Sequence, residues 1–267
     1  MDIKILGTGN ALVTECYNTC FVLDDDGKYF MVDGGGGSQI LSRLKQAGID
    51  VNDIHEIFVT HKHIDHLLGI IWMVRVICQN MRQGKYKGEA RIYGHEEVIG
   101  ILRSEAERLL QKKDMEAFDR TLHFVIVEDG EERMIDGKKV TFFDVGSTKA
   151  KQFGFCMETE DGKKLTCCGD EPYNEREYKY AYKSTWLLHE AFCLYGQRKV
   201  FHPYEKHHST AKDASELAET LEVENLILYH TEDKNIEKRK ELYTAEGKEY
   251  YSGNLFVPDD LETIRLW

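Results

Sequence analysis

The chain has 267 residues, of which 42% are hydrophobic, and its formal net charge is −12 at pH 7. This length and apolar content predict a sizeable core, arranged as one large domain or two small ones. No stretch approaches the roughly 18 consecutive apolar residues of a membrane helix, and residues 1–10 lack the pattern of a signal peptide. The acidic balance opposes non-specific binding to nucleic acid, because such binding relies on Lys and Arg neutralising phosphates.

The seven cysteines are odd in number and irregularly spaced, in a chain too long to need disulfide staples. They predict a reducing, cytoplasmic location. There is no low-complexity linker, no internal repeat and only three prolines. We therefore expect a single domain over residues 1–267.

The hydrophobic pattern of the first half predicts many strands and three helices. The expected strands cover residues 3–6, 19–23, 29–32, 55–60, 90–93, 121–127, 133–135 and 139–145. The expected helices cover residues 39–48, 67–81 and 96–112. Residues 33–38, DGGGGS, form a glycine-rich strand-to-helix loop, which is more often a tight turn than a phosphate cradle.

The second half predicts a hairpin of residues 153–159 and 163–168, strands at 186–189 and 225–229, and a helix at 209–221. Strands followed by alternating helices and strands suggest two sheets packed together, with helices outside.

The stretch FVTHKHIDHLLG, residues 58–69, carries the strongest chemical signal. His61, His63, Asp65 and His66 are four metal-ligand types within six residues, directly after an apolar strand. Imidazole and carboxylate ligands suit zinc, iron, nickel or manganese, and the lack of Cys argues against a closed structural zinc site. Alternation lets His61 and His63 share one ion, while the other two can face a second position. The alternative to a metal site is a polar turn with three surface histidines.

Four later segments are interpreted as apolar strands with an ionisable residue at the end. They are LTCCGD with Asp170, WLLHE with Glu190, EKHH with His208 and LILYH with His230. Ligands that follow strands gather at one edge of an α/β sheet, so these residues are candidates for the same site. A surface polar residue at a strand end is the alternative for each of them.

THKHIDH resembles the HxHxDH signature of metallo-β-lactamase-fold hydrolases. LGTGNA, VDGGGGSQIL, CCGDE, LLHEAF and HHSTAKDASELA resemble, in order, motifs of the ribonuclease Z branch, and together they span almost the whole chain. The resemblance implies an α/β fold, a four-layer αββα sandwich. It also implies a homodimer, which the helix at 67–81 is expected to carry.

The resemblance further implies two sets of metal ligands. One ion is held by Asp65, His66, Asp170 and His230, and the other by His61, His63 and Asp170. Up to two Zn²⁺ per chain are expected, with Mn²⁺ or Fe²⁺ as alternatives. Two ions ~3.5–4 Å apart activate a water and clamp phosphoryl oxygens.

The expected catalytic residues are Asp65, Glu190 and His208. Asp65 orients or deprotonates the attacking water. The LLHEAF and HHST segments imply a Glu190–His208 pair, in which His208 protonates the leaving oxygen or stabilises its charge. His189 is expected to be a packed strand residue.

The chain departs from the branch in two places. The loop at residues 144–152 lacks the His that the branch supplies to the first ion, so either three protein ligands remain or His123 or His95 replaces it. A missing donor lowers the affinity of the site for that ion. In addition, Phe155 and Asp170 are only fifteen positions apart, which leaves no room for the flexible arm of tRNA-processing members.

We therefore expect a metal-dependent phosphodiesterase of ribonuclease Z-like type. The missing arm and the acidic balance argue against tRNA precursor as its substrate. One alternative is a hydrolase of small esters (cyclic nucleotide, phosphonate, sulfate ester, thioester or lactone). Another is a non-catalytic metal-binding protein with a depleted first site.

Overall fold

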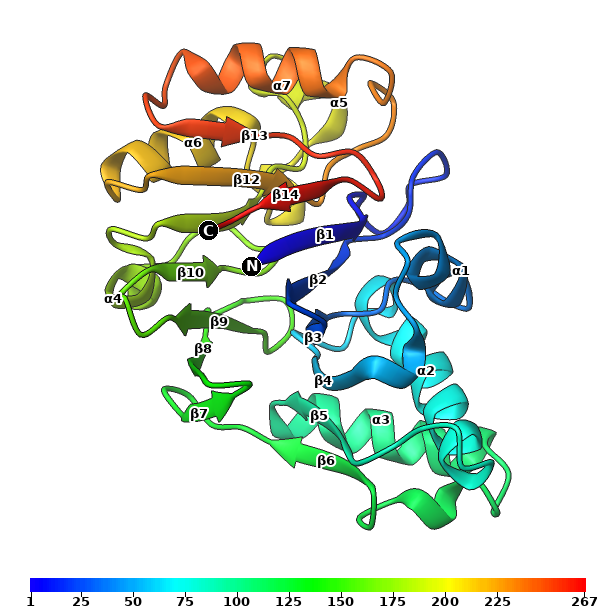
Figure 1. The fold of residues 1–267 in the computed structure, drawn as a ribbon. Helices are drawn as coiled ribbons and strands as arrows, with labels where there is room; N and C mark the ends of the chain where they lie inside the picture. Colours follow the sequence, from blue (N-terminus) through cyan, green and yellow to red (C-terminus); the bar gives the residue numbers. More distant parts are fainter. The chain divides into compact units, whose positions relative to one another are not determined.

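A computed structural model describes residues 1–267. The chain forms two compact units. Unit 1 consists of Met1–Gly7, Tyr17–Val127 and Asp260–Trp267, and unit 2 consists of Thr8–Cys16 and Glu128–Asp259. Each unit contains one seven-stranded sheet and its own helices (Figure 1). The expectation of one domain over the whole chain stays a prediction.

The sheet of unit 1 has the order β14-β1-β2-β3-β4-β5-β6. Strands β14, β1, β2 and β3 pair antiparallel, whereas β3 to β6 pair parallel. The parallel part brings the carboxyl ends of β3, β4 and β5 to one edge of the sheet. The strands are β1 Asp2–Gly7, β2 Cys20–Asp25, β3 Lys28–Val32, β4 Ile54–Phe58, β5 Ala90–Gly94, β6 Leu122–Ile126 and β14 Thr263–Arg265.

Three helices cover this sheet: α1 (Gln39–Gln46), α2 (Ile64–Arg82) and α3 (Glu96–Leu109). Their apolar stripes, such as Ile40 and Leu44 of α1, join buried strand residues in one core cluster. Helix α2 begins three residues before the expected position 67, because His63 is its extended N-cap residue. Helix α3 ends before the expected residue 112, because Leu110 leaves the helical conformation.

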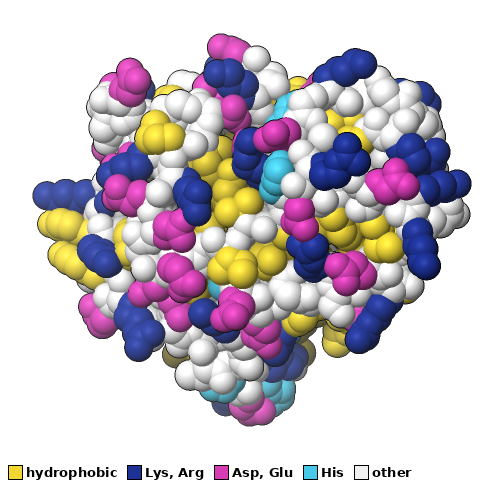
Figure 2. All heavy atoms as spheres, turned by 90° about the horizontal axis from the view of Figure 1, so that it is seen from below, with side chains coloured by type: hydrophobic (Ala, Val, Ile, Leu, Met, Phe, Trp, Pro, Cys, Tyr) yellow, Lys and Arg dark blue, Asp and Glu magenta, His cyan; other side chains and the backbone are white.

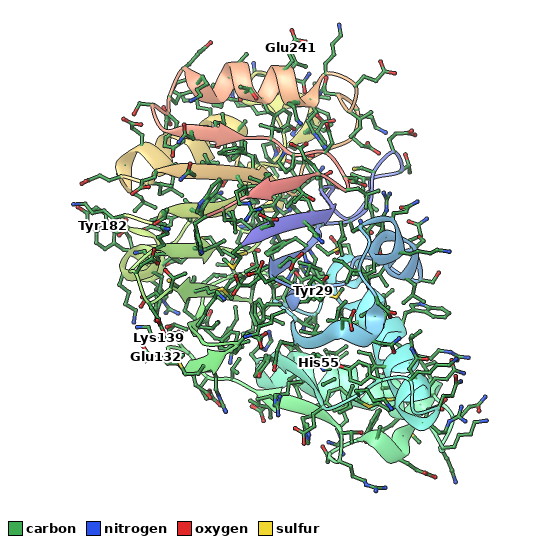
Figure 3. All side chains as sticks on the ribbon, viewed as in Figure 1. Tyr29, His55, Glu132, Lys139, Tyr182 and Glu241 are labelled. Atoms are coloured by element: carbon green, nitrogen blue, oxygen red, sulfur yellow. The ribbon has the colours of Figure 1, made fainter.

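The sheet of unit 2 has the order β13-β12-β11-β10-β9-β8-β7. Strands β7 to β10 form an antiparallel meander, and β10 to β13 pair parallel. Lys139 of β8 lies beside Glu132 of β7, at 3.5 Å between Nζ and Oε1 (Figure 3). The strands are β7 Glu132–Ile135, β8 Lys138–Asp144, β9 Phe153–Glu158, β10 Lys164–Cys167, β11 Trp186–Glu190, β12 Asn225–Tyr229 and β13 Asn254–Phe256.

The helices of unit 2 are α4 Tyr178–Ala181, α5 Arg198–Phe201, α6 Ala211–Thr220 and α7 Arg239–Lys248. Thr210 caps α6 through a reciprocal capping box with Asp213. The 3₁₀ turns are Val51–Asp53, Met115–Ala117, Glu175–Glu177, Tyr195–Gln197 and Tyr204–Lys206. Sequence patterns did not predict α4, α5, α7, β13 or β14. The helices α4 and α5 have only four residues each, α7 is largely polar, and the two strands are three residues long.

Acidic and basic side chains intersperse over the face drawn in Figure 2, with no broad basic area there. None of the helices is both long and apolar enough to cross a membrane.

Candidate metal centre

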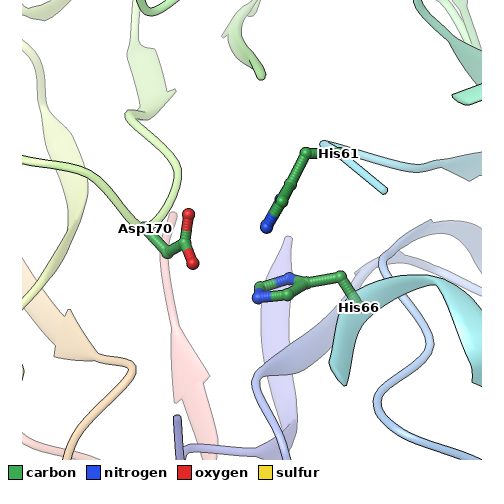
Figure 4. Close-up of side chains that lie close together, drawn as sticks. All are labelled: His61, His66 and Asp170. Carbon is green, nitrogen blue, oxygen red and sulfur yellow. The ribbon is translucent and has the colours of Figure 1, made fainter. Parts of the chain in front are cut away.

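The four potential ligands of the HKHIDH segment lie where β4 gives way to α2. His61 follows the strand, His63 is the N-cap residue of α2, and Asp65 and His66 lie in its first turn. His61, Asp65 and His66 are buried, each no more than 5% exposed. The rings of His61 and His66 lie side by side, with centroids 4.2 Å apart (Figure 4). Unit 1 thus gathers all four residues at one end of α2.

Asp33, at the end of the neighbouring strand β3, holds these histidines in place. Its carboxylate accepts hydrogen bonds from the backbone N–H of Thr60 at 2.8 Å, the hydroxyl of Thr60 at 2.8 Å and Nδ1 of His66 at 2.7 Å. Asp33 adopts the left-handed conformation with φ 57°, which Asp tolerates better than most residues. That turn points its carboxylate at the metal motif.

The hydrogen bonds to Asp33 fix the tautomers of two rings. The Thr60 hydroxyl hydrogen is donated to Asp33, so Nδ1 of His61, 2.9 Å from the same hydroxyl, is the donor there. Nδ1 of His66 likewise donates to Asp33. Both rings therefore carry the lone pair on Nε2, the form that ligates a metal.

Glycines of the β3–α1 loop hold α2 close to this strand end. The N–H of Gly34 donates to the carbonyl of His66 at 2.8 Å, and the N–H of Gly69 donates to the carbonyl of Gly35 at 2.8 Å. A Cβ on Gly34 would lie 2.6 Å from the backbone N of Ile70. The glycine-rich loop is thus a close backbone contact that seats the metal motif, in agreement with the tight-turn interpretation.

Unit 2 places three further candidates at the carboxyl edge of its parallel strands. Asp170 follows β10 (Figure 4), Glu190 ends β11 and His230 follows β12. Because β10, β11 and β12 pair parallel and in register, their ends meet at one edge. Nε2 of His230 lies 3.4 Å from Oδ2 of Asp170.

The Glu190–His208 pair is present in unit 2. Oε2 of Glu190 lies 3.1 Å from Nδ1 of His208, and its other oxygen accepts from the backbone N–H of Ser209. Glu190, His208 and His230 each bring a ligand atom within 4.8 Å of the others. The interpretation of EKHH as the end of a strand is wrong. Residues 204–206 form a 3₁₀ turn, and His208 enters the site from the loop before α6.

Burial governs the protonation of this pair. It lowers the pKa of His208 to about 4 and raises the pKa of Glu190 well above its usual value. The ring of His208 stacks on Phe192, with centroids 4.7 Å apart and an interplanar angle of 10°. His189 is buried in β11 with Nδ1 2.8 Å from the carbonyl of Glu190, which agrees with the expected packing role.

The loop that lacks the expected His contributes an amide instead. Gln152 is 1% exposed, and its Nε2 donates a hydrogen bond to Oδ1 of Asp170. The two histidines considered as replacements are both in unit 1. His123 on β6 lies 3.5 Å from Glu89, and His95 is the buried N-cap residue of α3. The 144–152 loop therefore places the neutral amide of Gln152, and no histidine, beside the Asp170 carboxylate.

The donor chemistry of each unit suits a divalent metal ion. In unit 1, Nε2 of His66 faces Oδ2 of Asp65 at 3.4 Å, and in unit 2 the His230–Asp170 pair repeats this distance. Because Nε2 of His66 carries a lone pair, it and Oδ2 of Asp65 are two electron-rich atoms that face each other. A cation bound between them would make this arrangement favourable. Buried imidazoles and carboxylates of this kind are ordinary ligands of zinc and related metals.

Known proteins with a similar sequence or fold include ribonuclease Z and other metallo-β-lactamase-fold proteins. Ribonuclease Z of Thermococcus sibiricus is 25% identical over 100% of this chain and 96% of its own length, and ribonuclease Z of Streptococcus gordonii is 22% identical over 100% of both. The metallo-β-lactamase-fold protein YhfI from Bacillus subtilis superposes with a TM-score of 0.79 at 15% identity, covering 98% of each chain. Human tRNase Z, short form, gives 0.76 at 18% identity, covering 100% of each.

The fold and these relatives define a metallo-β-lactamase-fold protein of the ribonuclease Z-like branch, and they support the class of metal-dependent hydrolases. The expected α/β fold of the metallo-β-lactamase type, with two sheets and their helices, is thereby confirmed. Within this class, the family described as "Anti-Pycsar protein Apyc1" matches residues 1–248, and the chain belongs to that family.

Sequence reasoning did not assign roles to Asp33 or Gln152. Asp33 stood in the VDGGGG motif, where an acidic residue at a strand end was a usable signal. Gln152 gave no signal, because an amide in a loop is ordinary until its neighbours are known.

Proposed function

We propose that this protein is a metal-dependent phosphodiesterase that hydrolyses a small phosphodiester, with cyclic nucleotides as the substrate class. The observation that carries the proposal is the pair of buried donor sets, each at the carboxyl edge of a parallel sheet, together with the Glu190–His208 pair. Donor sets of this composition are those used to activate water at neutral pH.

The proposed ligands are those that the family resemblance implies. Asp65, His66, Asp170 and His230 hold one ion, and His61, His63 and Asp170 hold the other. Asp33 fixes the ligating tautomers of His61 and His66, and Gln152 orients Asp170. We propose zinc as the metal, because nitrogen and oxygen donors at buried positions suit it.

Metal ions held by these residues would supply a water of lowered pKa and would polarise the phosphoryl oxygens. Asp65 orients that water and accepts its hydrogen bond. The carboxylate of Glu190 holds the Nδ1–H of His208, which keeps the ring in one orientation against Phe192. In this tautomer Nε2 of His208 carries the lone pair, on the side of the ring that faces the ammonium of Lys149 at 3.4 Å.

A small substrate is favoured over tRNA by the β9–β10 connection. Glu158 and Lys164 are joined by a plain turn, in the place where arm-bearing members insert their substrate arm. The family to which the chain belongs also points to cyclic nucleotides. A small cyclic diester needs no arm, because its single phosphate would be bound by the proposed metal site together with Glu190 and His208.

A second candidate is removal of the 3′ trailer from tRNA precursor. It is favoured by the ribonuclease Z relatives, which match the chain over its whole length. The acidic net charge of −12 weighs against a large polyanionic substrate.

The substrate test is a direct comparison on one preparation of the protein. Cyclic mononucleotides with each base, a tRNA precursor and an aryl phosphodiester are incubated with the zinc- or manganese-loaded protein, with and without a chelator. We expect chelator-sensitive conversion of a cyclic nucleotide to the monophosphate. Cleavage of the precursor alone would favour the second candidate, and metal binding without turnover on any ester would leave a non-catalytic metal-binding protein.

The division of roles is tested with two alanine variants. Asp65→Ala should lower both metal content and turnover, because Asp65 is a proposed ligand. His208→Ala should lower turnover with metal content intact. Equal loss of metal in the two variants would contradict this division.

We also infer a reducing, cytoplasmic location from the seven cysteines, all of which are in the thiol form.

A further inference from the structure

Lys149 stands in the loop that lacks the expected metal-binding His, and its ammonium reaches the catalytic pair. Nζ lies 3.4 Å from Nε2 of His208 and 3.1 Å from Oε1 of Glu171. It also donates to the carbonyls of Lys206 at 3.1 Å and His207 at 3.4 Å. The side chain keeps 24% of its surface exposed, so it is held in place yet reachable from solvent.

Hydrogen bonds within the loop fix the backbone around Lys149. The hydroxyl of Ser147 accepts from the N–H groups of Lys149 at 3.2 Å and Ala150 at 3.3 Å, and Asp144 accepts from the N–H of Gly146 at 2.8 Å. The ammonium has four acceptors around it, and the loop that carries it is held by hydrogen bonds to Ser147 and Asp144. These contacts indicate a pre-organised cation, which loses little conformational entropy when it binds a ligand.

The contact also decides what His208 can do. An ammonium has only donors, so Nε2 of His208 accepts from Lys149, and the ring hydrogen is on Nδ1, facing Glu190. In this state His208 has no proton to give on the side that faces Lys149. The group with protons to give there is Lys149.

We propose that Lys149 is a further substrate-contacting residue, whose ammonium binds the phosphate and stabilises the charge on the leaving oxygen. The inference rests on the proposed phosphodiesterase function. When the water oxygen forms its bond to phosphorus, the bond from phosphorus to the leaving oxygen breaks, and its electron pair stays on that oxygen. The oxygen takes a proton from the Lys149 ammonium, the attacking water releases one proton to solvent, and solvent returns one to the lysine.

The test compares Lys149→Met with Lys151→Met, a control in the same loop whose ammonium lies over the Phe153 ring at 5.2 Å. Two diesters are used: a cyclic nucleotide, whose leaving alkoxide is a poor leaving group, and an aryl diester that releases nitrophenolate. Loss of a donor to a developing oxyanion lowers rates by about 100-fold or more. We expect that loss on the cyclic nucleotide, less than about 5-fold loss on the aryl diester, and wild-type metal content.

The control Lys151→Met should match wild type on both diesters, and Lys149→Arg should recover part of the activity. Equal losses on both diesters, accompanied by lower thermal stability, would mean that Lys149 is only structural and would overturn the proposal. Activity of Lys149→Met equal to wild type would overturn it as well.

A binding measurement separates this inference from the proposed function. Calorimetry of a nucleoside monophosphate with wild type and Lys149→Met does not require turnover. We expect at least 10-fold weaker binding by the variant, and unchanged binding would overturn the role of Lys149 even in an active enzyme. If wild type hydrolyses neither diester, the proposed function fails, and this titration alone decides whether Lys149 contacts phosphate.

Discussion

Asp33 shows how one carboxylate can set the chemistry of two histidines. It accepts three hydrogen bonds, and through Thr60 and His66 it places the lone pairs of two rings on Nε2. Such partners of metal ligands contribute to affinity although they touch no metal themselves. We therefore infer that Asp33 prepares the proposed metal ligands of unit 1.

Asp33→Ala should weaken metal binding by about 10–100-fold, because His66 loses its acceptor and the Thr60 hydroxyl loses the partner that makes it an acceptor for His61. Chelator competition with the purified protein measures this affinity. Asp26→Ala is the matched control, since Asp26 is also left-handed, with φ 52°, but lies exposed in the β2–β3 turn. Equal metal affinity in the two variants would show that Asp33 acts only on the backbone.

The local metal motif was predictable from the residues, the Glu190–His208 pair was predictable from the family resemblance, and contacts that no motif describes were not predictable. The HKHIDH segment is recognisable as a metal-binding motif from sequence alone, because its four potential ligands fall within six positions. Asp33 meets His66 across 33 positions, and Lys149 meets His208 across 59. No local pattern encodes such contacts, so they required the structure.

At the scale of elements, the junction of the β3–α1 loop with α2 positions the metal motif. The backbones of Gly34 and Gly69 approach so closely that a Cβ on Gly69 would collide with the Gly34 carbonyl. Only glycine allows this approach.

Gly69→Ala should destabilise the protein by about 1–3 kcal/mol through this overlap, and it should weaken metal binding, because α2 carries Asp65 and His66. Gly100→Ala is the matched helical control, since it lies exposed on α3 with nothing near its Cβ position. It should be neutral or stabilising by about 0.5–1 kcal/mol. Urea unfolding measures both, and equal stability of the two variants would contradict the account.

Glu177, at the start of α4, gives a pH-dependent prediction. Burial raises its pKa to about 8 from an ordinary 4.5. The folded state thus binds this proton more tightly than the unfolded state, so the contribution is present below pH 4.5 and is lost as pH rises to about 8.

Glu177→Gln should remove that loss, because it keeps the acceptor for the N–H of Asn174 and cannot ionise. The difference in melting temperature between variant and wild type should increase from pH 5 to pH 9 in favour of the variant. A difference that does not change with pH would show that Glu177 is ionised throughout.

Most helices and strands followed from hydrophobic periodicity, and the errors have physical causes. Helix α2 starts earlier than its apolar run because His63 and Asp65 serve as the cap and first turn. The position of His208 differs from the expected strand end, because residues 204–206 form a 3₁₀ turn and His208 lies in the loop before α6.

At the scale of the whole molecule, α2 exposes an apolar stripe. Ile64, Leu68 and Trp72 follow one another at four-residue intervals and are 68%, 40% and 41% exposed. This face suits the homodimer that the family resemblance implies, because exposed apolar stripes mark association surfaces.

Trp72→Glu should convert a dimer to a monomer, which light scattering after size-exclusion chromatography detects. Leu109→Glu, at an exposed apolar position on α3, should leave the dimer intact. A monomeric wild type would remove the homodimer from the account.

The fold class was predictable from motif order, whereas the strand order was not. The sequence indicates which segments are strands, but the adjacency of β14 to β1 and of β13 to β12 joins distant or very short segments. Such pairings depend on the packed molecule rather than on local pattern.

The measurement that tests the central claim most directly is metal content per chain, determined by elemental analysis on protein purified without chelator or metal-affinity tag. We predict two equivalents of a divalent metal, with the second more easily lost on dialysis because the loop at residues 144–152 supplies no His. No bound metal, even after soaking in zinc or manganese, would contradict a metal-dependent hydrolase.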